Sequence, residues 1–90
     1  LDPSISTKKQ IKELTQFQDV DEMRQRNRQF FEDKIRRDRS KISIWVRYAA
    51  FEESQREWAR ARSVYERALD VDPYNITLFL KYAEMEMKNK

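Results

Sequence analysis

Two residue types that often carry enzyme chemistry, Cys and His, are absent from this chain of 90 residues. Thiolate and imidazole metal sites, cysteine nucleophiles and histidine-based triads are therefore excluded. One carboxylate, Glu52, falls at the seam between two predicted helices, where it could act as a general acid or base. No second catalytic group, phosphate-binding loop or cluster of metal ligands accompanies it in the sequence. We therefore predict a protein without enzymatic activity, metal or cofactor.

The structural interpretation of Glu52 is an ion pair between helices. A half-buried carboxylate without a partner is costly, because it loses its hydration and gains nothing in return. Two arginines, Arg62 and Arg67, lie on the next predicted helix. The sequence predicts that one of them pairs with Glu52.

Positive charge is concentrated in residues 22–41, which hold eight basic and four acidic residues, whereas residues 42–90 hold eight of each. Such a segment could contact an acidic protein or the phosphates of RNA. The alternative is a solvated helix face with structural salt bridges. The interleaved aromatic residues that single-strand binders use for base stacking are missing. The candidate contacts are Arg24, Arg28, Arg36, Arg37 and Arg39.

The elements that must position these side chains are predicted to be helices. Gly is absent and Pro occurs twice, so glycine-rich β-hairpins with turns at positive φ are disfavoured. Apolar residues recur at intervals of three and four, as on one face of a helix. This spacing predicts helices over residues 22–38, 42–53, 57–70 and 76–88, and a shorter one around Ile11, Leu14 and Phe17.

Polar residues mark where the predicted helices begin and end. Ser40 and Asn75 each stand just before a predicted helix and can accept hydrogen bonds from free amides in its first turn. Asp19 or Asp21 could do the same for the helix that follows them. Pro73 ends the helix before it, because proline disfavours helical geometry in the preceding residue.

The sequence matches itself when it is shifted by 34 residues. Trp45 then falls on Phe79 and Tyr48 on Tyr82, and the helices between and before them match at the same offset. A helix–turn–helix period of this length is typical of tetratricopeptide repeats, which stack into an all-α solenoid. The residues predicted to pack the repeats are Phe31, Ile35, Trp45, Tyr48, Ala49, Ala61, Tyr65, Ala68, Leu69, Pro73, Phe79, Tyr82 and Ala83.

The pattern within one repeat points to a narrower family. The run Trp-x2-Tyr-Ala-x2-Glu from Trp45 is followed by Ala-Arg-Ser-x-Tyr-Glu-Arg-Ala-Leu from Ala61 and then by Pro73. This pattern resembles the half-a-tetratricopeptide (HAT) repeat of RNA-processing proteins. The series over residues 22–90 is similar to the N-terminal repeats of the crooked neck family of spliceosomal HAT proteins. Phe79 stands where that family leads us to expect Trp, which keeps an aromatic side chain at the position.

The resemblance implies a non-catalytic protein–protein scaffold for pre-mRNA splicing in the nucleus, within the NineTeen (Prp19-associated) spliceosomal complex. The implied partners are other HAT-repeat and Myb-type splicing proteins, with contact to the backbone of small nuclear RNA as an added option. Two alternatives stay open. One is a HAT scaffold in 3′-end cleavage or ribosomal RNA processing, and the other is a basic RNA-contacting module through residues 22–41. No stretch approaches the roughly 20 apolar residues that span a bilayer, so no membrane partner is expected.

The repeat pattern divides the chain into four segments. Residues 1–21 are an N-terminal segment with a short helix or partial disorder, 22–39 the second helix of a partial repeat, 40–73 a complete repeat, and 74–90 the first helix of a truncated following repeat. We expect the chain to be cut from a longer protein. Repeats without a stacked neighbour expose apolar surface, so such a fragment could self-associate. The residues expected at this exposed face are Leu78, Leu80, Met85 and Met87.

Overall fold

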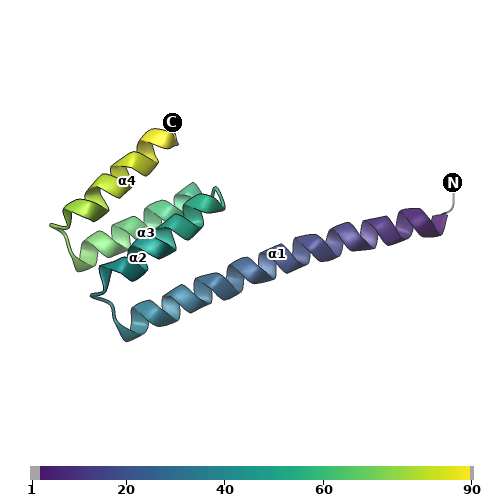
Figure 1. The fold of residues 1–90 in the computed structure, drawn as a ribbon, viewed down its shortest axis with the longest axis horizontal. Helices are drawn as coiled ribbons and strands as arrows, with labels where there is room; N and C mark the ends of the chain where they lie inside the picture. Colours follow the sequence, from purple (N-terminus) through teal and green to yellow (C-terminus); the bar gives the residue numbers. More distant parts are fainter. Residues whose placement is uncertain (1–2, 90) are drawn as a thin grey trace. The chain divides into compact units, whose positions relative to one another are not determined.

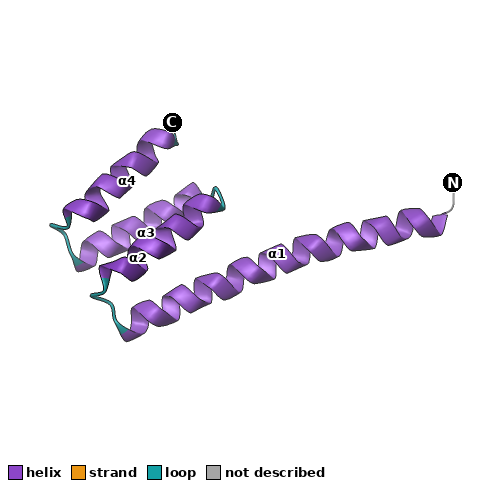
Figure 2. Ribbon diagram, in the orientation of Figure 1, coloured by secondary structure: helices purple, strands orange, loops and turns teal. Residues whose placement is uncertain are grey.

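The protein is a succession of α-helices. The computed structural model describes the backbone of residues 3–89 and the side chains of residues 19–89. The helices are α1 (Pro3–Arg37), α2 (Ile42–Ser54), α3 (Trp58–Val71) and α4 (Ile76–Lys88), as Figure 1 shows. No strand occurs among the described residues (Figure 2). The all-α prediction is therefore confirmed, and α2, α3 and α4 lie within one residue of their predicted bounds.

The chain divides into two compact units, the first ending at Phe30 and the second covering Phe31–Lys90. The first unit is helical backbone of α1, and the second contains the last turns of α1 together with α2, α3 and α4. Within the second unit, α3 packs against both α2 and α4. Ala49 on α2 and Ala61 on α3 are both fully buried, and their small side chains let the two helices approach closely. The buried core of this unit is formed by Ile35, Ile44, Trp45, Tyr48, Ala49, Ala61, Val64, Tyr65, Ala68, Leu78 and Met85.

A side chain caps the N-terminus of α4 but not that of α2. The side chain of Asn75 accepts a hydrogen bond from the backbone N–H of Leu78 at 3.0 Å, so the predicted cap of α4 is confirmed. Ser40 does not cap α2, and that prediction is wrong. The N-cap position belongs to Lys41, which makes no side-chain capping bond. The Ser40 hydroxyl stands one residue too early and donates to Asp38 Oδ1 at 3.1 Å instead.

One continuous helix, α1, replaces the two helices predicted before Arg37. Asp19 and Asp21, proposed as caps of a separate helix, lie inside it. The physical reason is that no Gly or Pro follows Pro3 within α1, and an Asp inside a helix costs only about 0.7 kcal/mol relative to Ala. The side chains of the apolar residues predicted upstream, around Ile11, fall outside the described ones.

The turn from α2 to α3 requires a left-handed residue, and Arg56 supplies it with φ 58°. The Arg56 N–H donates to the Glu53 carbonyl and the Glu57 N–H to the Glu52 carbonyl, both at 2.9 Å. These two bonds form a Schellman motif, whose left-handed position usually holds Gly. An arginine there is strained, because its Cβ crowds the backbone.

Candidate functional site

Glu52 lies too deep for acid–base chemistry on a substrate. Its side chain is 1% exposed, and every fully buried side-chain nitrogen or oxygen among the described residues has a hydrogen-bond partner. No group of three or more acidic residues that could hold a metal ion occurs among residues 19–89. Glu52 therefore acts as a satisfied polar residue of the core.

The predicted partners of Glu52 bind other carboxylates, so that part of the prediction is corrected. Arg67 pairs with Glu32, and Arg62 pairs with Glu86. Both arginines form ion pairs between helices, but with Glu86 and Glu32 instead of Glu52. Position along a helix does not fix which carboxylate a long guanidinium side chain reaches.

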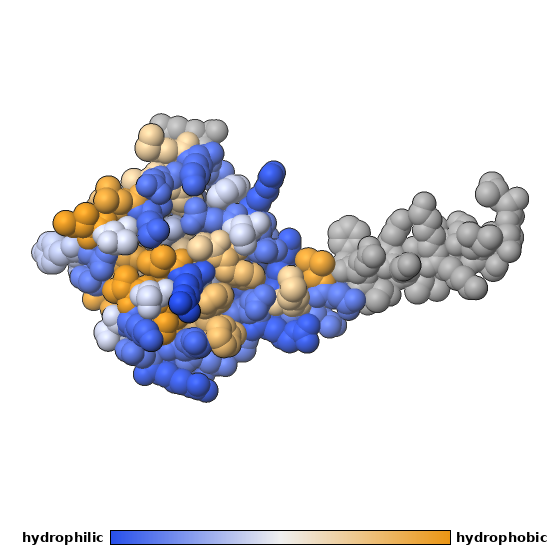
Figure 3. Space-filling model, viewed as in Figure 1, coloured by the Kyte–Doolittle hydropathy of each residue, from blue (hydrophilic) through white to orange (hydrophobic). Residues whose placement is uncertain are grey.

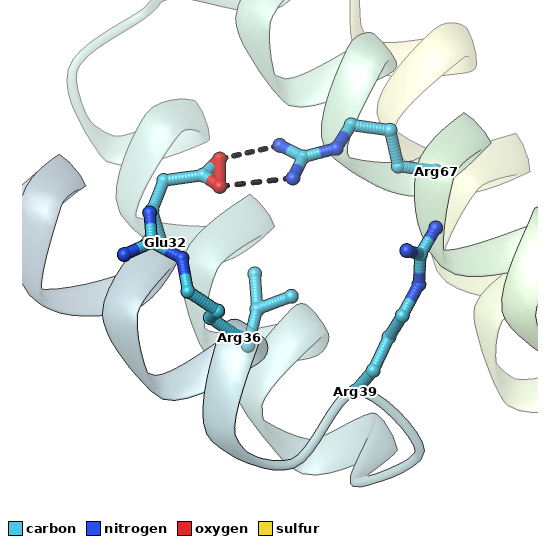
Figure 4. A pocket seen from close by; sticks show the side chains of 5 residues that line it. Glu32, Arg36, Arg39 and Arg67 are labelled. Atoms are coloured by element: carbon cyan, nitrogen blue, oxygen red, sulfur yellow. Dashed lines mark hydrogen bonds and ion pairs between the residues drawn. The ribbon is translucent and has the colours of Figure 1, made fainter.

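Glu32, Tyr48 and Arg67 form a polar clamp across three helices. Arg67 Nη1 and Nη2 donate to Glu32 Oε1 and Oε2 at 2.5 and 2.9 Å (Figure 4). The Tyr48 hydroxyl donates to Glu32 Oε1 at 3.3 Å. The hydrogen bond from Arg67 lowers the pKa of Glu32. Burial, followed by the charge of Glu32, raises the pKa of Tyr48 to about 12. The clamp therefore holds a carboxylate, a guanidinium and a neutral phenol in one place at neutral pH.

The same guanidinium also covers the core tryptophan. The Arg67 Cζ atom lies 5.1 Å from the centroid of the Trp45 ring, within cation–π range. The indole N–H of Trp45 donates to the backbone carbonyl of Arg39 at 2.9 Å. Arg67 thus joins the end of α1 to α3, and Trp45 ties α2 to the loop between α1 and α2.

A second bidentate pair joins α3 to α4. Arg62 Nε and Nη2 donate to Glu86 Oε1 and Oε2 at 2.6 and 3.1 Å. The hydrogen bond from Arg62 lowers the pKa of Glu86. Tyr65 on α3 reaches in the other direction, and its hydroxyl donates to Glu53 Oε2 on α2 at 2.8 Å. Side chains of α3 therefore bind both neighbouring helices.

The tyrosine–carboxylate contact recurs one repeat later. The Tyr82 hydroxyl donates to Glu66 Oε1 at 2.9 Å, which matches the bond from Tyr48 to Glu32 at an offset of 34 residues. Burial and the hydrogen bond to Glu66 raise the pKa of Tyr82 to about 12. Sequence reasoning missed both bonds, although the repeat signal places Glu32 on Glu66 and so could have linked them.

The aromatic packing recurs at the same offset. Phe31 stacks on Tyr48 with ring centroids 5.1 Å apart and planes 9° apart. Tyr65 stacks on Tyr82 with centroids 5.4 Å apart and planes 11° apart. The aromatic residues of the repeat therefore pack against one another in the core, in equivalent geometry in both repeats.

The five arginines proposed to bind an acidic protein or RNA have different environments. Arg28 is only 9% exposed, and both Arg24 and Arg28 already make interactions within the chain. Arg36, Arg37 and Arg39 are exposed near the end of α1. Because a buried guanidinium cannot reach an external anion, Arg28 leaves the set of candidates.

Two of the exposed arginines line a cavity, which we call the basic pocket. It has a volume of about 350 Å³ and is lined by Glu32, Ile35, Arg36, Arg39 and Arg67. Figure 4 shows Arg39 extending from the loop after α1 toward Arg67, with the Glu32–Arg67 pair across the top of the space. The basic pocket brings together Arg36 and Arg39, which the sequence predicted only as part of a basic segment, with Arg67 from α3.

The exposed apolar surface of α4 differs from the predicted one. Leu80 and Met87 are exposed, but Leu78 and Met85 are completely buried, so the prediction is wrong for these two residues. Leu78 and Met85 lie seven residues apart on the face of α4 toward α3, together with the half-buried Tyr82. Two turns of a helix cover seven residues, which explains why these positions share the core-facing side.

Residues predicted to pack in the core of the repeat are instead exposed on α4. Phe79 is 62% exposed, whereas its equivalent Trp45 is 1% exposed, and Ala83 is exposed, whereas Ala49 is buried. The reason is that α3 covers this face of α2, and no described helix follows α4 to do the same. Pro73 is also exposed, at the turn before α4.

The uncovered part of α4 forms an apolar surface, which we call the α4 face. In Figure 3 hydrophobic residues gather over the first half of α4. They line an open pocket of about 350 Å³, and most of the surface of this pocket is apolar. The residues around it are Pro73, Tyr74, Asn75, Ile76, Phe79 and Leu80.

None of the helices, within the residues described, is both long enough and apolar enough to cross a membrane.

Comparisons with known proteins support the resemblance to HAT repeats. Residues 27–90 match the family described as "Pre-mRNA-splicing factor Syf1/CNRKL1 N-terminal HAT repeat". Human Crooked neck-like protein 1 is 56% identical over 62 residues, which cover 69% of this chain and 7% of that protein.

Fungal relatives agree. Pre-mRNA-splicing factor clf-1 of Neurospora crassa is 51% identical over 65 residues, covering 69% of this chain and 9% of that protein. Pre-mRNA-splicing factor CLF1 of Saccharomyces cerevisiae is 38% identical over 60 residues, covering 67% of this chain and 9% of that protein. The chain thus spans less than a tenth of the length of these relatives. The chain belongs to the Syf1/crooked neck family of HAT-repeat pre-mRNA-splicing factors.

Proposed function

We propose that this chain is part of a non-catalytic protein–protein scaffold for pre-mRNA splicing in the nucleus. The observation that carries the proposal is the match of residues 27–90 to the N-terminal HAT repeat of splicing factors. Relatives named as pre-mRNA-splicing factors support splicing over 3′-end cleavage or ribosomal RNA processing. The finer assignment is to the NineTeen complex, with other HAT-repeat and Myb-type splicing proteins as partners.

The geometry supports a scaffold because it fixes the helices against one another. The clamp of Glu32, Tyr48 and Arg67 joins the end of α1 to α2 and to α3, and the pair of Arg62 with Glu86 joins α3 to α4. In repeat proteins each unit contacts only its neighbours, so the geometry of each junction sets the path of the whole array. A junction held by bidentate bonds keeps the outward side chains in fixed positions, as a surface that binds several partners requires.

A splicing assay in nuclear extract tests this function. The extract is depleted of the natural protein that carries this chain, and the purified protein is then added back with a pre-mRNA substrate. A scaffold role predicts that depletion blocks splicing and that added protein restores it. Depletion that leaves splicing intact while stopping 3′-end cleavage or ribosomal RNA processing would assign the protein to one of those pathways instead.

A further inference from the structure

We propose that the basic pocket binds a carboxylate side chain from an acidic segment of a partner protein. This inference rests on the scaffold function proposed above and names the chemistry of one contact. The pocket contributes three guanidinium groups, those of Arg36, Arg39 and Arg67, and one carboxylate, that of Glu32. Because Arg67 and Glu32 neutralise each other as a bidentate pair, two positive charges remain for a ligand.

Those two charges are available. Among the described residues the Arg39 guanidinium has no ion pair or hydrogen bond, and Figure 4 shows it extending along one side of the pocket. Arg36 makes one contact, with Asp33 at 3.5 Å, and its side chain is 76% exposed. An exposed pair of this length contributes little, so Arg36 can exchange Asp33 for an incoming carboxylate.

The backbone at Arg39 and the floor of the pocket are held in place before any ligand arrives. The Trp45 indole N–H fixes the Arg39 backbone carbonyl at 2.9 Å, and Trp45 itself is buried in the core. Ile35, also buried, forms an apolar floor on which the methylene groups of a Glu side chain can pack. A site assembled in advance loses less conformational entropy when it binds.

A carboxylate fits this site better than an RNA backbone. RNA presents a run of phosphates and needs a track of cations, usually with aromatic side chains for base stacking. Here Glu32 lines the pocket, and Asp33 and Asp38 lie next to its arginines, so a run of phosphates would meet negative charge. A single carboxylate can lie between Arg36 and Arg39 and receive charge-assisted bonds from both.

Fluorescence anisotropy with two labelled probes tests the proposal. One probe is a hexaglutamate peptide, and the other is an oligouridylate RNA of similar charge. The pocket variant is Arg36→Gln with Arg39→Gln. The matched control is Arg47→Gln with Lys81→Gln, which removes the same charge from exposed positions outside the pocket. Circular dichroism checks that both variants keep the helical content of the wild-type chain.

We expect the pocket variant to bind the peptide at least tenfold more weakly, and the control to change affinity by less than about threefold. Equal losses in the two variants would overturn the proposal, because binding would then follow net charge alone. A wild-type chain that does not bind the peptide at low salt would also overturn it. So would a pocket variant that loses RNA affinity and keeps peptide affinity. None of these results bears on whether the natural protein restores splicing in a depleted extract.

Discussion

Glu32 and Arg67 lie 35 residues apart, yet the two nitrogens of one guanidinium bind the two oxygens of one carboxylate at 2.5 and 2.9 Å. The pair joins the last turns of α1 to α3, and the Tyr48 hydroxyl from α2 binds the same carboxylate. Three helices therefore meet at Glu32. We expect these contacts to stabilise the fold, which the first prediction below tests.

Removal of either partner of this pair should destabilise the chain. Glu32→Gln keeps the shape and removes the charge, so we expect a loss of about 1 kcal/mol, because both side chains are partly exposed and screened by solvent. Arg67→Ala also removes the contact with Trp45, so we expect about 2 kcal/mol. Urea unfolding followed by circular dichroism measures both. A double-mutant cycle should give a coupling energy above about 0.5 kcal/mol, and additive losses would show that the pair contributes nothing.

Alkaline pH should weaken the fold between pH 10 and about 12. Burial and the charge of Glu32 raise the pKa of Tyr48 from 10.0 to about 12. A folded-state pKa above the unfolded value means that the stabilisation is complete below pH 10 and is lost as pH rises through the folded pKa. For Tyr48 the loss is on the order of 2 kcal/mol.

Urea midpoints measured from pH 8 to pH 12 for the wild type and for Tyr48→Phe check this dependence. The Phe variant should be less stable at pH 8 and should lose less stability on the way to pH 12. Tyr82 has the same direction of shift, so some pH dependence remains in the variant. Identical slopes in the two proteins would exclude Tyr48 as a source.

Replacement of Arg56 by Gly should stabilise the chain. Arg56 has φ 58° at the left-handed position between α2 and α3, where glycine avoids a steric cost of roughly 1–2 kcal/mol. The greater freedom of Gly in the unfolded chain offsets part of this gain, so we expect a net increase of about 0.5–1 kcal/mol. The control Arg47→Gly, at an exposed position inside α2, should lose about 1 kcal/mol. Thermal unfolding that shows a loss for both variants would contradict the strain argument.

Self-association should depend on the α4 face. The exposed side chains of Phe79 and Leu80 lie next to the apolar pocket, and contact between two copies would remove them from water. Replacing both with Ser should weaken association at least about tenfold, measured by sedimentation equilibrium over a range of concentrations. Lys81→Gln on the same helix serves as the control. A wild-type chain that stays monomeric at every concentration would show that the α4 face does not bind itself.

The periodic features of the fold could be predicted from the sequence. The bounds of α2, α3 and α4 follow from the spacing of apolar residues and from Pro73, and these signals are local. The 34-residue repeat correctly placed Trp45, Tyr48 and Ala49 in the core, because a repeat presents the same face to the same neighbour. It failed for Phe79 on α4, where no described helix supplies that neighbour.

The partner of each charged or polar side chain could not be predicted from the sequence. Arg62 and Arg67 were expected to bind Glu52 on α2, but they bind carboxylates on α4 and α1. A guanidinium on a long, flexible side chain can reach several carboxylates, so its position in the sequence does not fix its partner. Ser40 failed as a cap by one residue, since capping requires one backbone conformation and not only a nearby hydroxyl. The basic pocket combines Arg36 and Arg39 with Arg67 from α3, and no local pattern joins them.

Affinity purification of the tagged natural protein from nuclear extract tests the central claim most directly, with the bound proteins and RNAs identified. The splicing-scaffold account predicts recovery of NineTeen-complex proteins, including HAT-repeat and Myb-type splicing factors, together with spliceosomal small nuclear RNAs. Recovery of cleavage factors or ribosome-assembly proteins in place of these would contradict the splicing assignment and leave the HAT-repeat fold unchanged.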